Sequence, residues 1–276
     1  MNTIRLTALA VSVAMGLAAL PGHAGEVLAR VMETKLLKVA TDANWAPQSF
    51  MNENNEMDGF DVDVAKEIGK RLGVSVEFVT PGWDIITAGN WQGRWDMHVG
   101  SMTPTAERAK IFAFPAVYYY TPAAVAVHGD SKAAQLSDLD GKTVGTTASS
   151  TFEAYANQDL TLDAAGAPAF TYQFKPGEVK SYANSSTAFD DLRLGDGVRL
   201  DAVVSSLPSI LEAAKAGYPI RQLGEPVFYE PLAVAIEHGD QDLNDKIAEA
   251  VAAMKADGTL SALSLKWYGQ DYTAAE

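Results

Sequence analysis

Hydroxyl-bearing and charged side chains gather where a predicted strand is followed by a predicted helix. The segment 100–108 (GSMTPTAER) places the hydroxyls of Ser101 and Thr103 at the end of a strand, and Arg108 follows one turn later. Pro104 suits the first position of a short helix capped by Thr103. A guanidinium at this place can hold a carboxylate through two parallel hydrogen bonds. The alternative is a surface arginine that pairs with a neighbouring acid.

The segment 146–153 (TTASSTFE) is the counterpart in the second half of the chain. Its hydroxyls, including that of Thr151, crowd a second strand-to-helix junction, whose free N–H groups attract an anion. Ordinary helix capping is the alternative. Two tryptophans, Trp45 and Trp83, fall on loops at strand ends. Because loops lie at the surface, these rings are candidates for contact with a ligand.

Several kinds of chemistry are missing from the sequence. The chain has no Cys and four His, and it lacks the nucleophile-elbow, phosphate-loop and dinucleotide-binding motifs. The acids at positions 58, 61 and 63 do not match a calcium loop, because its Gly and terminal Glu are out of register. Asp61 is expected to stabilise the start of a helix. We therefore predict no catalytic residue, no metal site and no cofactor.

Composition places the chain among globular proteins of about two domains. The 276 residues are 47% hydrophobic and 20% charged. Acidic residues outnumber basic ones 35 to 21, which gives a net charge of −14. A surface this negative repels phosphate backbones, so nucleic acid is not expected as a partner.

Residues 1–24 have the pattern of a secretory signal peptide. Arg5 supplies the positive charge, residues 6–20 form an apolar run, and residues 22–24 end in a small-residue cleavage site after Ala24. The apolar run is shorter than the roughly 20 residues that a membrane-spanning helix needs. The sequence therefore predicts a soluble protein exported to the periplasm.

Short strands and helices alternate along the rest of the chain. Strands are predicted over residues 36–40, 74–79, 96–100, 123–128, 143–146, 202–205, 220–223 and 233–236. Helices are predicted over residues 60–72, 83–90, 150–155, 189–194, 207–215, 240–257 and 259–268. Residues 156–183 are expected to be rich in loops. This βαβ alternation indicates two α/β lobes with mainly parallel sheets, and ligands bind at the carboxyl ends of such strands.

Several segments together resemble a known family. They are residues 59–72 (GFDVDVAKEIGKRL), 103–108 with Phe114-Pro115, 138–145 (DLDGKTVG), 201–204 and 254–268. On these segments the chain resembles the periplasmic solute-binding proteins of family 3, which deliver polar amino acids to ABC importers. The resemblance implies a two-lobed α/β fold of the Venus-flytrap kind, type II, with hinge crossings near residues 119–123 and 224–230. It implies that lobe one is residues 25–121 and 227–276, and that lobe two is residues 122–226.

The resemblance also implies roles for particular residues. Arg108 would hold the α-carboxylate of the ligand, with hydrogen bonds from Ser101, Thr103 and Thr151. Asp42 would meet the amino or distal cationic end. Trp45 and Trp83 would enclose the side chain of the ligand.

One position departs from the family pattern in a way that affects the ligand. Ser206 stands where the family has the acid of lobe two that holds the α-ammonium group, and the resemblance implies that Ser206 also contacts the ligand. A neutral hydroxyl cannot offset a buried cation as a carboxylate does, so Asp42 or Glu230 is left to meet the cationic end. Trp45 and Trp83 beside Asp42 could then hold a substituted or quaternary ammonium by cation–π contact.

The expected function is substrate binding for an ABC importer. The expected partners are a small-molecule ligand, an amino acid or a related zwitterion, and an inner-membrane ABC permease, and the protein is expected to be a monomer. The competing hypothesis is a periplasmic enzyme of the same fold, similar to a dehydratase, which would need a positioned acid or base such as Asp42 or Glu230.

Overall fold

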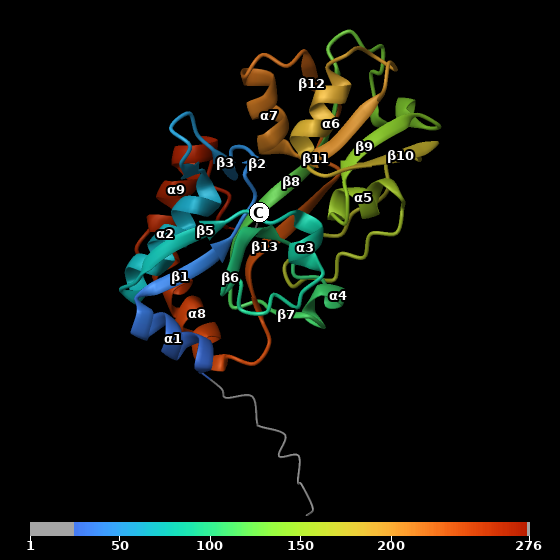
Figure 1. Cartoon of the computed structure of the whole chain (residues 1–276). Coiled ribbons are helices and arrows are strands. Elements are labelled where there is room, and N and C mark those ends of the chain that lie inside the picture. Colours follow the sequence, from blue (N-terminus) through green and yellow to red (C-terminus); the bar gives the residue numbers. More distant parts are fainter. Residues whose placement is uncertain (1–24, 275–276) are drawn as a thin grey trace, which may run out of the picture.

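A computed structural model of the chain describes residues 25–274, which form two α/β lobes joined by two long strands (Figure 1). The predicted signal peptide, residues 1–24, lies outside the described residues. The helices are Glu26–Thr34 (α1), Phe60–Leu72 (α2), Trp83–Thr87 (α3), Ala106–Ala109 (α4), Thr151–Ala156 (α5), Ser185–Leu192 (α6), Leu207–Lys215 (α7), Gln241–Ala256 (α8) and Thr259–Tyr268 (α9). The strands are Leu36–Ala40 (β1), Asn44–Trp45 (β2), Ser49–Met51 (β3), Met57–Asp58 (β4), Ser75–Val79 (β5), Met97–Met102 (β6), Phe112–Ala113 (β7), Val117–His128 (β8), Thr143–Thr147 (β9), Glu178–Tyr182 (β10), Ala202–Ser206 (β11), Ile220–Gln222 (β12) and Phe228–Glu237 (β13).

One sheet of ten strands runs through both lobes. Its order is β10-β9-β11-β8-β13-β6-β1-β5, with β12 beside β8 and β7 beside β13. At one end β1 pairs in parallel with β5 and β6, and at the other end β9 pairs in parallel with β10 and β11. The long strands β8 and β13 lie between these groups and pair antiparallel with each other. Each lobe therefore has the parallel strands that βαβ alternation predicts, whereas the connection between the lobes is antiparallel.

Strands β8 and β13 carry the chain from one hydrophobic core to another. Tyr119 and Leu232 pack in the core of the lobe that contains α2, α8 and α9. Ala123 and Phe228 pack in the core beneath α5 in the other lobe. The chain therefore crosses between the cores over residues 119–123 and again over residues 228–232. We propose the lobe limits expected from the sequence, which are residues 25–121 with 227–276 for lobe one and residues 122–226 for lobe two.

The structure corrects the ends of several predicted elements. The helix expected over residues 83–90 ends at Thr87, and the strand expected over residues 96–100 continues to Met102. The segment 156–183, which was expected to be loops, ends in β10, and β10 pairs along its whole length with β9. Helix α1 and the small sheet β2-β3-β4 were not predicted. Strands β2, β3 and β4 have only two or three residues each, which is too few for an alternating pattern to show.

The start of helix α2 lies close to the backbone of residues 47–48. The N–H of Phe60 donates to the carbonyl of Pro47 at 3.1 Å, and the N–H of Asp61 donates to the carbonyl of Gln48 at 2.8 Å. Gly59, just before the helix, has a φ of +124°, and a Cβ added there would lie 2.4 Å from the Gln48 carbonyl oxygen. Only glycine fits this position without a clash or strain.

We expect Gly59→Ala to lower the free energy of unfolding by roughly 2–3 kcal/mol, because a strained backbone and an overlap with a carbonyl oxygen are combined. Urea unfolding measures this loss. Gly73→Ala is the matched control: Gly73 has a φ of +72°, but an added Cβ would meet nothing within 4 Å. The control variant should lose only about 1–2 kcal/mol. An equal loss in both variants would show that the contact with Gln48 does not matter.

Candidate ligand-binding site

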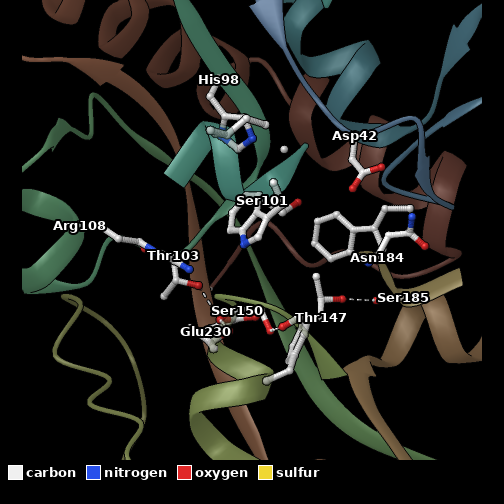
Figure 2. Close-up of a pocket in the computed structure, with 16 residues that line it drawn as sticks. Asp42, His98, Ser101, Thr103, Arg108, Thr147, Ser150, Asn184, Ser185 and Glu230 are labelled. Atoms are coloured by element: carbon white, nitrogen blue, oxygen red, sulfur yellow. Dashed lines mark hydrogen bonds between the residues drawn. The ribbon is translucent and has the colours of Figure 1, made fainter. Parts of the chain in front are cut away.

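A cavity of about 50 Å³ lies between the lobes and is lined by residues of both (Figure 2). Strands β1, β6 and β9 end beside it, as expected for parallel strands whose carboxyl ends carry a binding site. The lining residues are Asp42, Trp45, Trp83, Ile86, His98, Gly100, Ser101, Thr103, Arg108, Thr147, Ser150, Thr151, Phe152, Asn184, Ser185 and Glu230. Seven of the eight residues predicted from the sequence are therefore brought together, and Ser206 is not.

Arg108 lies on the short helix α4 and reaches across to the second lobe. Its Nη1 donates to the carbonyl of Thr103 at 3.0 Å, and its Nη2 donates to the carbonyl of Ser149 at 3.1 Å. The guanidinium carbon lies 5.4 Å from the centroid of the Trp83 ring. Burial lowers the pKa of Arg108 to about 10, against the opposing charge of Glu230, so the side chain is cationic at neutral pH.

The helix that carries Arg108 is capped differently from the prediction. Thr105, rather than Thr103, is the N-cap of α4, and its hydroxyl accepts the N–H of Arg108 at 3.3 Å. Pro104 therefore precedes the cap instead of opening the helix. The hydroxyl of Thr103 therefore does not cap the helix, and it donates instead to Glu230 in the cavity wall.

Glu230 is a buried carboxylate in the wall of the cavity. It is the third residue of β13, opposite Thr121 of β8, and is 2% exposed. Its Oε2 accepts the hydroxyl of Thr103 at 2.5 Å and the hydroxyl of Thr151 at 2.7 Å. Burial raises the pKa of Glu230, while these two hydroxyls and the charge of Arg108 oppose that rise. The Oε2 atom of Glu230 thus connects β13 to a hydroxyl of each lobe, Thr103 in lobe one and Thr151 in lobe two.

The hydroxyl of Ser101, which was expected to bind the ligand, is bonded to other side chains. Its Oγ donates to Asp61 at 2.8 Å and lies 2.5 Å from the hydroxyl of Tyr119. The other carboxylate oxygen of Asp61 accepts the hydroxyl of Tyr118 at 2.7 Å. Asp61 is therefore not the helix cap that we predicted, since Gly59 holds that position. Burial raises the pKa of Asp61 to about 7.

Ser206 is fully buried outside the cavity lining. It is the N-cap of α7, where its hydroxyl accepts the N–H of Ser209 at 3.4 Å and donates to the hydroxyl of Ser209 at 2.9 Å. The same oxygen accepts the side-chain N–H of Gln48 at 2.9 Å, which comes from the other lobe. The hydroxyl of Ser206 is fully used by these contacts, so we leave Ser206 out of the proposed site.

The cavity lining also contains a second carboxylate and two tryptophan rings. Asp42 follows β1, and its Oδ1 accepts the N–H of Asn44 at 2.7 Å. Burial raises the pKa of Asp42, and hydrogen bonds from the backbone partly oppose that rise. Trp45 and Trp83 line the same cavity, and the ring of His98 lies 5.7 Å from that of Trp83. Burial and the charge of Arg108 lower the pKa of His98 to about 3, so this imidazole is neutral.

Direct hydrogen bonds tie the two lobes together around the cavity. The indole N–H of Trp83 donates to the carbonyl of Ser149 at 3.3 Å, beside the bond from Arg108 to the same carbonyl. On the opposite side, the hydroxyl of Ser186 donates to the carbonyl of Asn44 at 2.8 Å. The lobes are therefore in contact on both sides of the cavity, which is a closed arrangement.

Sequence reasoning did not single out several of the lining residues. Asn184 and Ser185 begin α6, which was predicted to start only at residue 189, and Ile86 and Phe152 add apolar walls. Within residues 25–274, no group of three or more His, Asp or Glu side chains is arranged to hold a metal ion. No helix in that same range is both long and apolar enough to span a membrane.

Comparisons with known proteins agree with this geometry. The chain matches the model of the bacterial extracellular solute-binding proteins, family 3, over residues 37–270. It is 29% identical over 250 residues to the L-cystine-binding protein TcyJ of Escherichia coli (strain K12), covering 90% of this chain and 88% of that one. An ancestral arginine-binding protein bound to arginine matches with a TM-score of 0.73 and 35% identity over 85% of this chain and 99% of that chain. The ancestral amino acid-binding protein AncCDT-1, a precursor of cyclohexadienyl dehydratase, matches with a TM-score of 0.74 and 31% identity over 87% and 99%.

Fold and site together define a two-lobed α/β binding protein of type II, whose cavity lies between the lobes. The chain belongs to the bacterial extracellular solute-binding proteins, family 3, as its sequence segments predicted. The relatives that it matches over most of its length are named as amino-acid-binding proteins. The chain therefore has a substrate-binding role.

Proposed function

We propose that this protein is the exported substrate-binding component of an ABC importer, which captures an amino acid or a related zwitterion between its lobes and delivers it to an inner-membrane permease. The observation that carries the proposal is a cavity between two lobes in contact, with a guanidinium, Arg108, at one side and a carboxylate, Asp42, at the other. A zwitterion presents the opposite charges at its two ends. We also propose export to the periplasm through residues 1–24.

Each end of the ligand has a partner in this proposal. Arg108 takes the carboxylate through its planar fork, because such a pair is stronger and more directional than one with a point charge. Asp42 takes a cationic group, and Trp45 and Trp83 enclose the apolar part of the ligand. Relatives named for binding cystine and arginine support a ligand of amino-acid type.

A binding role is favoured over catalysis, although one structural neighbour is the precursor of a dehydratase. Glu230, a buried acid with a raised pKa in the cavity, is the kind of group that such an enzyme would use. The two functions differ in the fate of the ligand. We expect a bound amino acid to be recovered chemically unchanged after long incubation, and a new product would support the enzyme.

The experiment that tests the proposal identifies the ligand directly. The protein is purified without added amino acids and denatured, and the released molecules are identified by mass spectrometry. In parallel, a thermal-shift screen compares amino acids, betaines and related zwitterions. We expect an amino acid to be released and the same compound to raise the melting temperature, because a ligand that binds only the folded state stabilises it. A response to betaines alone would favour the quaternary ammonium hypothesis.

The two-lobed fold leads to a prediction about motion. A ligand that touches both lobes makes all of its contacts only when they are closed, so it should shift the population toward the closed state. We expect solution scattering to give a smaller radius of gyration at saturating ligand than without ligand, and a mass that fits a monomer. Identical profiles in the two conditions would argue for a rigid protein.

A further inference from the structure

Glu230 is a buried carboxylate whose hydrogen-bond partners are neutral. It is 2% exposed, and its Oε2 accepts hydrogen bonds from the hydroxyls of Thr103 and Thr151. Among residues 25–274, it has no ion-pair partner within 4.0 Å, although Arg108 is near enough to influence its pKa. Buried charges in proteins are normally paired, because an isolated one loses its hydration without compensation. A cationic ligand group beside Glu230 would supply the missing partner.

The position of Glu230 suits the α-ammonium group of an amino acid. Figure 2 places Glu230 and Thr103 on the same side of the cavity as Arg108. In an α-amino acid the carboxylate and the ammonium group are attached to the same carbon atom. When Arg108 holds the ligand carboxylate, the ammonium group therefore lies close to Glu230. Ser206 cannot take this role, since its hydroxyl is bonded to Gln48 and Ser209 away from the cavity.

Asp42 then remains for a different cation. It lies across the cavity from Glu230 and Arg108 (Figure 2), whereas the ring of Trp83 lies 5.4 Å from the guanidinium of Arg108. With His98 neutral, the charged groups that line the cavity are two carboxylates and one guanidinium. The lining therefore carries a net charge of −1. An α-amino acid with an uncharged side chain has no net charge and cannot balance it. A second cation on the ligand would balance it.

We propose that Glu230 determines specificity by acting as the counter-ion of the α-ammonium group, so that Asp42 selects an α-amino acid whose side chain is an amine or a guanidine. This inference rests on the proposed function, in which Arg108 takes the carboxylate. It replaces the acid expected in lobe two with an acid on β13, one of the two strands that join the lobes.

Ligands that each lack one charge test the proposal on the wild-type protein. Calorimetry compares arginine with citrulline, which lacks the side-chain cation, and with 5-guanidinopentanoate, which lacks the α-ammonium group. We expect each analogue to bind about 100-fold more weakly than arginine, as for the loss of one partner of a buried charge pair. Lysine and norleucine form a second matched pair. Citrulline and norleucine binding as tightly as their charged counterparts would overturn the proposal.

Variants assign each charge to its residue. Glu230→Gln should weaken the binding of arginine about 100-fold but change that of 5-guanidinopentanoate by less than about threefold. Asp42→Asn should remove the preference for arginine over citrulline. Glu107→Gln, which changes an exposed acid next to Arg108, is the control and should leave all affinities unchanged. Melting curves without ligand check that each variant is folded.

The outcomes separate this inference from the proposed function. If Glu230→Gln binds arginine as tightly as the wild type, Glu230 is not the counter-ion, while binding of any α-amino acid still supports the proposed function. If no α-amino acid binds and agmatine, the analogue of arginine without a carboxylate, binds instead, the proposed function itself fails. Because the wild-type ligand series needs no variant, a variant that does not fold leaves the test intact.

Discussion

Replacing Arg108 by alanine should weaken ligand binding by roughly 30- to 1000-fold, which corresponds to about 2–4 kcal/mol. Within its own lobe, the guanidinium is held by the carbonyl of Thr103 and lies against the ring of Trp83. It is therefore positioned before the ligand arrives, and little entropy is lost when a carboxylate binds. Arg108→Lys should recover only part of the affinity, because an ammonium group cannot reproduce the two parallel hydrogen bonds.

Calorimetry with the co-purified ligand measures this effect. Arg94→Ala is a matched control, because Arg94 also lies over a tryptophan ring, that of Trp95 at 4.7 Å, and donates to a backbone carbonyl at 3.0 Å. Arg94 does not line the cavity, so its loss should leave affinity unchanged. An Arg108→Ala protein that is folded and binds with wild-type affinity would show that the carboxylate is held elsewhere.

Asp61→Asn should change how the stability of the protein depends on pH. Burial raises the pKa of Asp61 from its ordinary value of 3.8 to about 7, although Tyr118 and Ser101 donate to its carboxylate. Between these two pH values the folded state binds a proton that the unfolded state does not bind. The stability that this proton provides is complete at low pH and is lost as the pH rises through about 7. Since one pKa unit equals about 1.4 kcal/mol, the loss is roughly 4 kcal/mol.

Asparagine does not titrate, so the variant should gain stability relative to the wild type, by up to that amount, as the pH rises from 4 to 8. Urea unfolding of both proteins at several pH values measures the difference. Asp257→Asn is a control of opposite sign: hydrogen bonds from Thr259 and Arg71 lower the pKa of Asp257 to about 2. The effect of that change should be constant between pH 4 and 8. A constant difference for Asp61→Asn would mean that Asp61 is ionised throughout.

Much of the fold follows from local sequence patterns. Helix α2 has the predicted bounds because Phe60, Val64 and Ile68 recur at helical spacing, and all three are buried. Helices α7 and α9 also have the predicted bounds. A helix with such periodicity buries its apolar face regardless of which segment it packs against, so the pattern alone identifies the helix. The five-residue strand β10 lacks this redundancy and was missed. Helix α1 was also missed, although Val27, Leu28 and Val31 recur at helical spacing and could have identified it.

The sequence also identified most of the residues around the cavity. Arg108 and Trp83 could be singled out because each follows a predicted strand, and the carboxyl ends of parallel strands meet at one edge of a sheet. Asp42 was expected from the resemblance to the family. Their roles toward a ligand stay predictions until binding is measured. The sequence predicted that these residues lie close together, because the order of strands and helices places the ends of the strands side by side.

Tertiary structure decided what each polar group faces. Ser101 and Ser206 were both expected to serve the ligand, but one hydroxyl is directed to Asp61 and the other to Gln48. Glu230 sits in a largely apolar strand, and its place in the cavity wall depends on the register of β13 against β8. Hydrogen-bond partners of this kind lie 40 to 158 residues away along the chain. No local pattern encodes them, because the direction of a side chain is set by the packing of segments that meet only in the folded protein.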